Sequence, residues 1–278
     1  MYADSINKQQ KSFNRELYKN SDLAKTGKIQ YFIKRKNMVT NSFYSSSLIK
    51  DGLAGIGIED EGRILSLLEK YIDEIELFNP AYGLVKVKDR RELIVKHVLD
   101  SLAPINIIRN LLVTRKQSQI KQPKIADIGT GAGFPGIPLA ICMPDSDFIL
   151  VERMKRRAGF LLNTLAVLGI VNATVEESEM ENLAATPSFA GIFDLILFRA
   201  WKPLSPVIMN YLFTLLSPCG KIAAYKGRRE SIEEEISFLC HSLANSHTQL
   251  PYIFETVSVN VPFLDEERHL LLVGKSLK

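Results

Sequence analysis

The stretch that decides the fold reads Asp127-Ile-Gly-Thr-Gly-Ala-Gly-Phe-Pro-Gly136. It begins inside the apolar run KIADI (124–128), which has the composition of a buried strand, and it continues into an apolar segment that ends near Ile141. Glycines permit positive φ angles and let a backbone approach a ligand closely. In doubly wound folds the turn between the first strand and the first helix lies where ligands bind. We therefore predict a strand, a ligand-binding turn and a short helix over residues 124–141.

Strands and helices alternate on the C-terminal side of this turn. Apolar runs rich in β-branched residues predict the strands, and apolar positions three or four apart predict the helices. The predicted strands cover 147–152, 172–177, 193–199, 220–227, 252–261 and 268–275, and the predicted helices cover 154–168, 206–218 and 230–245. This alternation predicts an α/β fold with a doubly wound, mostly parallel, seven-stranded sheet.

The N-terminal side of the turn has helical rather than strand periodicity. We predict one helix over 60–78, stopped by Asn79-Pro80, and a second over about 91–112 that breaks at Pro104. We accordingly divide the chain into a weakly ordered extension, a helical cap and a core. These three parts span residues 1–46, 47–115 and 123–278.

The charge of the chain is concentrated in the extension. Residues 1–50 hold ten Lys or Arg against three Asp or Glu, whereas the remaining residues hold 25 against 28. Such a basic segment is either a tail that touches RNA or a dispensable start, with Met38 as the true initiator. On the body of the protein, a surface for nucleic acid has to be a local patch.

Composition excludes several classes of protein. No stretch approaches the roughly 20 consecutive apolar residues that a membrane span needs, and the first residues lack the apolar run of a signal peptide. The three cysteines form no C-x-x-C pair, which argues against a zinc site and a disulfide framework. We expect a cytoplasmic protein without a metal.

An acidic residue completes the predicted ligand site. Glu152 follows the second predicted strand, 21 residues after Gly131, and a carboxylate at that place can accept both ribose hydroxyls of an adenosyl ligand. Gly129, Gly131 and Gly133 have the tight spacing that is typical of S-adenosylmethionine sites.

Another cofactor class also fits part of this turn. Gly131-x-Gly133-x-x-Gly136 satisfies the dinucleotide fingerprint, so a nicotinamide oxidoreductase is an alternative, as is a turn without any ligand. Asp127 favours the methionyl ligand, because a carboxylate near the turn repels a pyrophosphate and attracts a cation.

Cationic side chains are predicted at the ends of several elements. Arg199 ends the fourth strand, where it can hold a phosphate or a carboxylate or form an ion pair with a strand-end acid. Lys226 is either an RNA phosphate contact or a solvated lysine. Lys155, Arg156 and Arg157 oppose the dipole of their helix, which indicates a phosphate contact or a solvated basic face, and of these we take Lys155 and Arg156 as candidates. Together with Arg268, these are our tentative RNA contacts.

No nucleophile–base constellation is apparent among the four histidines. His269 beside the last strand is more typical of a packed histidine than of a catalyst. His97 and Asp100 lie three positions apart and can share a helical face, so we favour a role between cap and core over contact with substrate.

Five segments extend the pattern beyond the glycine turn. They are ELIVKHVLDSL (92–102), ADIGTGAGFPGIPLA (126–140), FRAW (198–201), YKG (225–227) and LDEERHLLLV (264–273). In this order they resemble the bacterial 16S ribosomal RNA guanine-N7 methyltransferases, the glucose-inhibited division protein B family. The resemblance covers roughly residues 48–276, and it implies the class I methyltransferase fold.

The resemblance implies an S-adenosylmethionine site at Gly129, Phe134, Met180-Glu181 and Arg199. This chain departs from the family in Glu152, where Asp is usual, in Met180, where Ala or Val is usual, and in FRAW, where SRAF is commoner.

The implied reaction moves a methyl group to nitrogen 7 of a guanine in 16S ribosomal RNA, free or in the small subunit. Because that nitrogen carries no proton, no general base is expected, and Arg199 would act by positioning. A methyltransferase for another RNA, a protein or a small molecule, or a ribosome-binding protein without turnover, are the alternatives.

Overall fold

The computed structural model describes residues 45–59, 62–113, 122–244 and 252–276, and the chain from Leu48 onward forms one compact unit. The predicted extension, residues 1–46, lies outside the described residues apart from its last two. The predicted boundary between a cap (47–115) and a core (123–278) stays a prediction. In the part of the chain that is described, no helix is long and apolar enough to cross a membrane.

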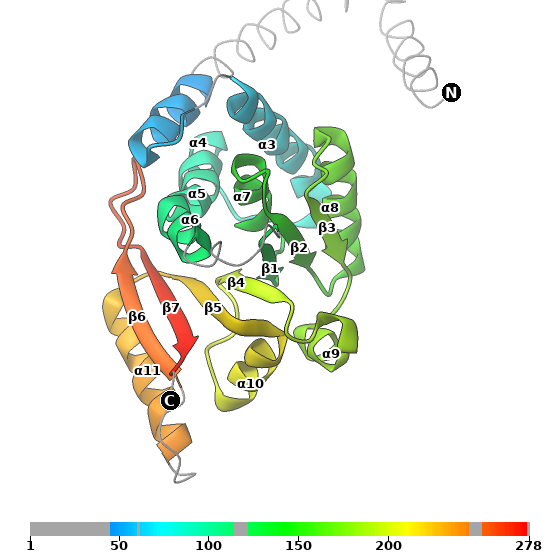
Figure 1. Cartoon of the computed structure of the whole chain (residues 1–278). Coiled ribbons are helices and arrows are strands. Elements are labelled where there is room, and N and C mark those ends of the chain that lie inside the picture. The colour runs from blue at the N-terminus through cyan, green and yellow to red at the C-terminus, as the bar shows by residue number, and fades with distance from the viewer. Residues whose placement is uncertain (1–44, 60–61, 114–121, 245–251, 277–278) are drawn as a thin grey trace, which may run out of the picture. The chain divides into compact units, whose positions relative to one another are not determined.

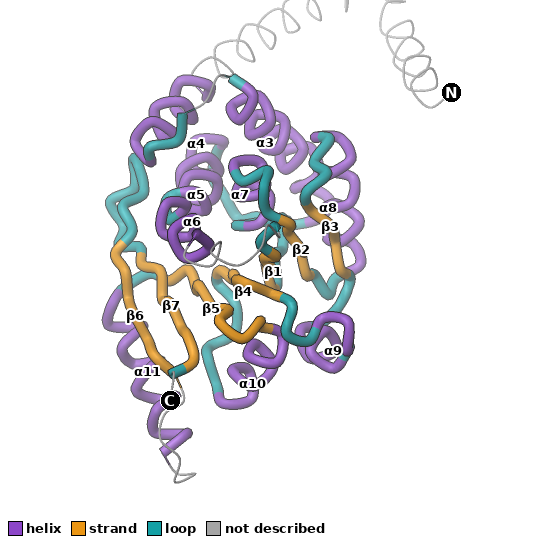
Figure 2. Tube along the Cα trace, viewed as in Figure 1, coloured by secondary structure: helices purple, strands orange, loops and turns teal. Residues whose placement is uncertain are grey.

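A seven-stranded sheet runs through this unit (Figure 2). Its strands are β1 (Lys124–Ile128), β2 (Asp147–Val151), β3 (Ala173–Glu176), β4 (Phe193–Arg199), β5 (Leu216–Lys226), β6 (Tyr252–Ser258) and β7 (His269–Lys275). The order across the sheet is β3-β2-β1-β4-β5-β7-β6. The pairs from β3 to β5 are parallel, whereas β7 pairs antiparallel with both β5 and β6. The predicted doubly wound, mostly parallel fold is confirmed.

Helices cover both faces of the sheet (Figure 1). One face carries residues 48–56 and the helices α3 (Arg63–Tyr82), α4 (Arg90–Leu93), α5 (Asp100–Leu102), α6 (Ile105–Val113), α7 (Gly136–Cys142) and α8 (Lys155–Leu168). The other face carries α9 (Met180–Ala185), α10 (Pro206–Leu215) and α11 (Arg229–Ala244), with a short 3₁₀ turn at Pro187–Phe189. Each face has its own apolar cluster, as a sheet buried on both sides requires.

Several predicted element ends are wrong, among them that of the strand predicted over 252–261, which ends at Ser258. Helix α3 does not stop at Asn79-Pro80 but runs through Pro80 to Tyr82. Proline is tolerated there because the helix ends within the same turn, where Gly83 adopts a φ of 58° and donates its N–H to Asn79. Residues 216–218 belong to β5 and not to the preceding helix, and a register shift follows in the pairing of β5 with β4.

The predicted helix over 91–112 is interrupted twice. It pauses at Pro104 as predicted, since α6 starts at Ile105. An unpredicted π-helical turn, Ile94–Leu99, joins α4 to α5. Such widened turns occur often at functional sites because they redirect side chains on a helix. This one carries Lys96 and His97.

The direction of winding reverses between β1 and β4, which are neighbours in the sheet. Ligands of open α/β sheets bind outside the carboxyl ends of the strands at such a reversal. The glycine turn follows β1 and Arg199 ends β4, so the fold brings both predicted features to this place.

Candidate active site

The glycine turn is fastened by its own backbone. The N–H groups of Gly129 and Thr130 donate to the Val151 carbonyl at 2.9 and 3.1 Å. Gly129, Gly131 and Gly133 have φ angles of 68°, 62° and 103°, a region that side chains other than glycine rarely occupy. A Cβ on Gly131 would have no neighbour closer than 4.0 Å, whereas one on Gly133 would collide with Ile137. Gly131 therefore faces open space, and Gly133 serves internal packing.

Asp127 lies fully buried beneath this turn. Its Oδ2 accepts hydrogen bonds from Thr130 Oγ1 at 2.6 Å and from the Gly136 N–H at 2.8 Å. Its Oδ1 has no hydrogen-bond partner among the described residues. Burial raises the pKa of Asp127 to about 6. A buried carboxylate with one unsatisfied oxygen is poorly stabilised, so a cation placed near the turn would be favoured.

Glu152, only 4% exposed, connects the turn to the next helix. Its Oε2 accepts from the Gly131 N–H at 3.1 Å, and its Oε1 accepts from the Met154 N–H at 2.8 Å. Each carboxylate oxygen has a second lone pair, so both can still accept a hydroxyl.

A cavity of about 380 Å³, the turn cavity, opens beside Gly129 and Glu152. It brings together four of the predicted cofactor residues, Gly129, Glu152, Met180 and Glu181. The rest of its wall is Ile128, Val151, Arg153, Met154, Arg157, Ser178, Glu179, Ala200, Trp201 and Lys202. Its three acids face three cations, of which Arg153 pairs with Glu179 and Lys202 with Glu181, so Glu152 is the acid left to receive the hydroxyls of a sugar.

A second cavity of about 450 Å³, the rim cavity, lies over the ends of β4 and β5. Its wall is Lys96, His97, Asp100, Pro104, Phe198, Arg199, Ala200, Trp201, Tyr225, Lys226, Gly227, Val259, Arg268, His269 and Leu270. Ala200 and Trp201 belong to both cavities, which therefore adjoin.

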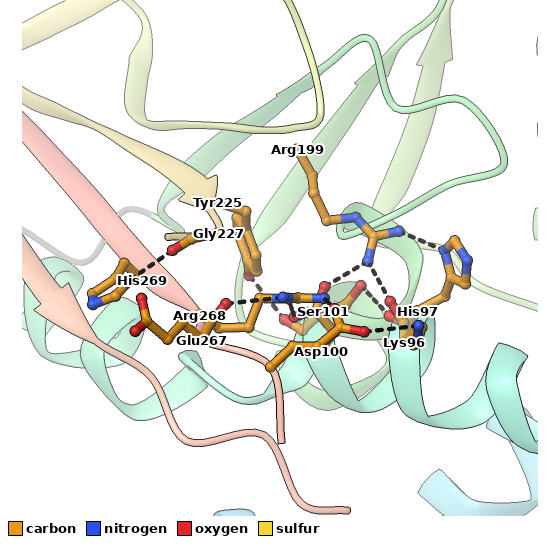
Figure 3. A network of polar contacts seen from close by, with 11 residues as sticks. Lys96, His97, Asp100, Ser101, Arg199, Tyr225, Gly227, Glu267, Arg268 and His269 are labelled. Atoms are coloured by element: carbon orange, nitrogen blue, oxygen red, sulfur yellow. Dashed lines mark hydrogen bonds and ion pairs between the residues drawn. The ribbon is translucent and has the colours of Figure 1, made fainter. Parts of the chain in front are cut away.

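Arg199 is held by the π-helical turn (Figure 3). Its Nη1 donates to the Lys96 carbonyl at 3.1 Å and to Asp100 Oδ2 at 2.9 Å, and its Nη2 lies 2.9 Å from His97 Nδ1. The guanidinium also lies 5.1 Å from the centre of the Phe134 ring. The considered ion pair with an acid is present, although the acid, Asp100, is the first residue of α5 and does not end a strand.

His97 is neutral in this environment. Burial, followed by the charge of Arg199, lowers the pKa of His97 to about 4. A guanidinium only donates, so Nδ1 of His97 accepts and its proton sits on Nε2. The lone pair of this histidine is engaged, and it cannot remove a proton near neutral pH.

Asp100 joins the predicted cap to the sheet, as favoured from the sequence. It accepts from Arg199 on β4 and, through Oδ1, from Arg268 Nε at 3.1 Å. Beside it, the Tyr225 hydroxyl on β5 donates to the Ser101 carbonyl at 2.8 Å, and burial raises the pKa of Tyr225 (Figure 3).

Three further residues singled out from the sequence are held by packing, by an ion pair or by a backbone contact. Phe134 lines neither cavity and packs against the rings of Tyr71 and His97, with centroids 5.2 Å apart in each case. Lys226 is 17% exposed and pairs with Glu235 at 2.6 Å, so the alternative of a solvated lysine is wrong. His269 is 7% exposed and lies 2.7 Å from the Gly227 carbonyl through Nδ1, which fits the packed histidine expected.

The tentative RNA contacts are dispersed. Lys155 and Arg156 are exposed on the first turn of α8 outside both cavities, and the Arg156 guanidinium lies 4.7 Å from the centre of the Tyr82 ring. Arg268 lines the rim cavity but also pairs with Glu266 at 2.8 Å. No group of three or more potential metal ligands occurs in the described ranges.

Sequence reasoning missed Trp201 as a cavity residue, and it considered Arg157 only as a phosphate contact or part of a solvated basic face. Arg157 lines the turn cavity, and its Nη2 donates to the Gly83 carbonyl at 3.4 Å. Trp201 belongs to the quoted FRAW segment but was given no role. Its position two residues beyond a strand at the reversal point was the available signal.

The sequence of this chain is similar to one family of known proteins. The sequence model of the family described as GidB, rRNA small subunit methyltransferase G, matches residues 64–260. A "Ribosomal RNA small subunit methyltransferase G" from Treponema denticola is 34% identical over 86% of this chain and 98% of its own length. Another of that name from Cronobacter sakazakii is 33% identical over 79% and 92%.

Among solved structures, a Klebsiella pneumoniae chain described as a candidate O-methyltransferase superposes with a TM-score of 0.50 at 15% identity. The match covers 79% of this chain and 92% of that one. At this identity the likeness concerns the fold alone.

Proposed function

This chain belongs to the GidB family, rRNA small subunit methyltransferase G, and from that membership we propose that it moves a methyl group from S-adenosylmethionine to nitrogen 7 of a guanine in 16S ribosomal RNA. One observation carries the proposal. A cavity suited to an adenosyl cofactor adjoins a second cavity in which His97 is neutral and has its Nδ1 lone pair engaged by Arg199.

The residues of the turn cavity fit S-adenosylmethionine. The lone pairs of Glu152 can accept ribose hydroxyls, and Met180 offers apolar contact to a base. Gly131 does not line the cavity itself, but the open space beside it would admit a ligand to the backbone. The unsatisfied oxygen of Asp127 favours a nearby cation. When bound, this cofactor supplies an electrophilic methyl group on a positively charged sulfur. The dinucleotide alternative is disfavoured, because a pyrophosphate at this turn would be repelled by Asp127.

The rim cavity would orient the acceptor. Nitrogen 7 of guanine carries an in-plane lone pair and no proton, so the enzyme has to align that lone pair and exclude water. His97 stays neutral and its Nδ1 accepts from Arg199, whereas His269 donates its Nδ1 N–H to the Gly227 carbonyl. This arrangement supports catalysis by positioning, without a general base.

We assign Arg199 a positioning role. Its contacts with Lys96, His97 and Asp100 fix the π-helical turn against the end of β4. This turn forms one wall of the rim cavity. Phe134 contacts the His97 ring and the Arg199 guanidinium. It would therefore support the cofactor site by packing, without touching the cofactor.

The substrate is 16S ribosomal RNA, free or within the small subunit, which places the enzyme in the cytoplasm where subunits are assembled. Lys155 and Arg156 are the exposed cations nearest to Arg157 of the turn cavity in sequence, and they support RNA contact on that side. Lys226 is paired with Glu235 and Arg268 with Asp100, so each would contact RNA while keeping its carboxylate partner.

The test is the RNA itself. In a strain that lacks this protein, 16S ribosomal RNA should miss one 7-methylguanosine by mass analysis, and the wild-type gene should restore it. A gene carrying Gly131→Val should fail to restore it, whereas one carrying Gly191→Val should succeed. Unchanged 7-methylguanosine would refute this function, and S-adenosylhomocysteine binding would then indicate another acceptor.

A further inference from the structure

Trp201 lies where the two cavities meet. It lines both of them, and it is the single tryptophan of the chain. Its ring packs so closely on Gly129 that a Cβ added there would lie 2.7 Å from Trp201 Cδ1. The indole also packs against Phe198, with ring centroids 5.3 Å apart at 55°. The indole therefore stands between the predicted cofactor site and the predicted acceptor site.

The loop that carries Trp201 is held in an unusual conformation. Ala200 has a φ of 48°, one of two positive values for residues other than glycine in the described part of the chain. Lys202 pairs with Glu181 across the turn cavity at 3.1 Å, and the Leu204 N–H donates to Glu235 at 2.7 Å. Backbone strain of this kind persists only where surrounding contacts impose it. Both anchors together fix the position of the indole.

The other aromatic residues of the rim cavity present less surface. Phe198 is 1% exposed, and Tyr225 is 8% exposed with its hydroxyl engaged by Ser101. Trp201 is more exposed than either of them, and the Lys202 Nζ that lies 5.7 Å from its ring centre belongs to a side chain that is 56% exposed. Among the described aromatic rings of this cavity, it is the one available for stacking.

The charged side chains of the rim cavity are paired with one another, which leaves a role for an aromatic face. Its acid, Asp100, is shared by Arg199 and Arg268, while Lys226 pairs with Glu235 and Lys96 with Glu266. When nitrogen 7 uses its lone pair to form the bond to the methyl carbon, the bond from carbon to sulfur breaks and the positive charge passes to the base. No free carboxylate lines the described wall to balance that charge, but an aromatic face attracts a cation.

We propose that Trp201 is the stacking platform of the target guanine and stabilises the positive charge that the base acquires. This inference rests on the proposed function. Stacking sets the plane of the base, so the in-plane lone pair points along one line toward the adjoining turn cavity. The interaction strengthens as charge develops on the base, so it accelerates the transfer and not merely binding.

The first experiment separates stacking from support of the cofactor. Trp201→Leu keeps apolar bulk without an aromatic face, Trp201→Phe keeps a smaller face, and Phe238→Leu on the exposed side of α11 is the matched control. Small subunits lacking the methyl group are the substrate. At saturating S-adenosylmethionine, Trp201→Leu should lower kcat about tenfold to a hundredfold, the size of one lost base–aromatic contact. Trp201→Phe should lose less, and the control nothing.

Calorimetry with S-adenosylhomocysteine supplies the second readout. Affinity should stay within about threefold of wild type in Trp201→Leu, since a stacking role concerns the other cavity. If kcat is unchanged, or if affinity falls and excess cofactor restores kcat, Trp201 is only a wall of the cofactor site and the proposal is wrong. If the wild-type protein fails to methylate the subunits, the proposed function itself is wrong.

A third readout uses the tryptophan as its own probe. In the presence of S-adenosylhomocysteine, 7-methylguanosine 5′-monophosphate should quench its emission saturably and more strongly than guanosine 5′-monophosphate, because the methylated base is cationic. It should also inhibit the wild-type enzyme more than Trp201→Leu. Absence of both quenching and inhibition would contradict the proposal.

Discussion

The turn cavity and the rim cavity are built in different ways. The turn cavity is formed mainly by segments that follow β1, β2 and β3, and backbone N–H groups fasten it to Val151 and Glu152. The rim cavity is formed by side chains from distant segments, and its ion pair between Arg268 and Asp100 spans 168 positions. The first kind of site depends on local backbone conformation, and the second on how the helices before the sheet meet it. Substitutions should therefore affect the two cavities in different ways.

The largest effect is expected at the glycine turn. Gly131→Val places a β-branched residue at a φ of 62° beside open space that the cofactor would fill. Gly191→Val imposes the same strain at a φ of 69° with nothing within 4 Å, away from both cavities. Both should lose about 1–2 kcal/mol of stability. Calorimetry should detect no S-adenosylhomocysteine binding by a folded Gly131→Val protein, and normal binding by Gly191→Val. Equal affinities would remove the turn from the cofactor site.

This contrast also explains what could be predicted. Strands β1 and β4 match their predicted bounds, because buried parallel strands read as continuous apolar runs. Glu152 and Gly129 were placed correctly in one cavity, because a strand end and the turn beside it are neighbours in every such sheet. Local pattern was sufficient for this part of the site.

The rim cavity required tertiary information. The π-helical turn has no signature in apolar spacing, so the contacts of His97 and Lys96 with Arg199 could not be derived. The partner of Lys226 lies nine positions away on another element, which spacing alone does not reveal. Trp201 was missed for the same reason, because its role depends on two cavities meeting.

The second largest effect is expected at Arg199. Arg199→Ala leaves Asp100 with one of its two arginines and frees the π-helical turn from β4. Removing one partner of a buried ion pair costs about 3 kcal/mol. Misplacing a cavity wall by about 1 Å can cost about a hundredfold in kcat. Arg109→Ala, which removes a hydrogen bond to the Cys142 carbonyl, is the control. It should lose some stability without losing kcat at a temperature where both variants are folded, as circular dichroism can verify. Parallel losses of activity and stability in both variants would make Arg199 purely structural.

A smaller effect is expected at Asp127. In Asp127→Asn the amide oxygen can still accept from Thr130 and Gly136, but the negative charge is gone. The affinity for S-adenosylmethionine should fall about tenfold, equivalent to about 1.4 kcal/mol. The raised pKa means that the folded wild-type protein binds more protons than the unfolded chain between about pH 4 and 6, so its stability falls as pH rises through that window. Urea titrations should show this contribution absent in the variant. An unchanged affinity for the cofactor would show that the charge does not act on it.

The smallest effect is expected in the dependence of kcat on pH. The pH dependences of kcat and of cofactor affinity should differ. In the rim cavity His97 has a pKa of about 4, so it changes its charge only well below neutral pH. The kcat at saturating S-adenosylmethionine should therefore be constant from about pH 6.5 to 8.5, because no base is needed and no group of the mechanism titrates there. Beneath the glycine turn, by contrast, Asp127 gains a proton below about pH 6 and loses its attraction for a cation. Cofactor affinity should decline there in the wild-type protein and not in Asp127→Asn. A rise of kcat with an apparent pKa near 7 would instead reveal a general base, and with it an acceptor atom that carries a proton.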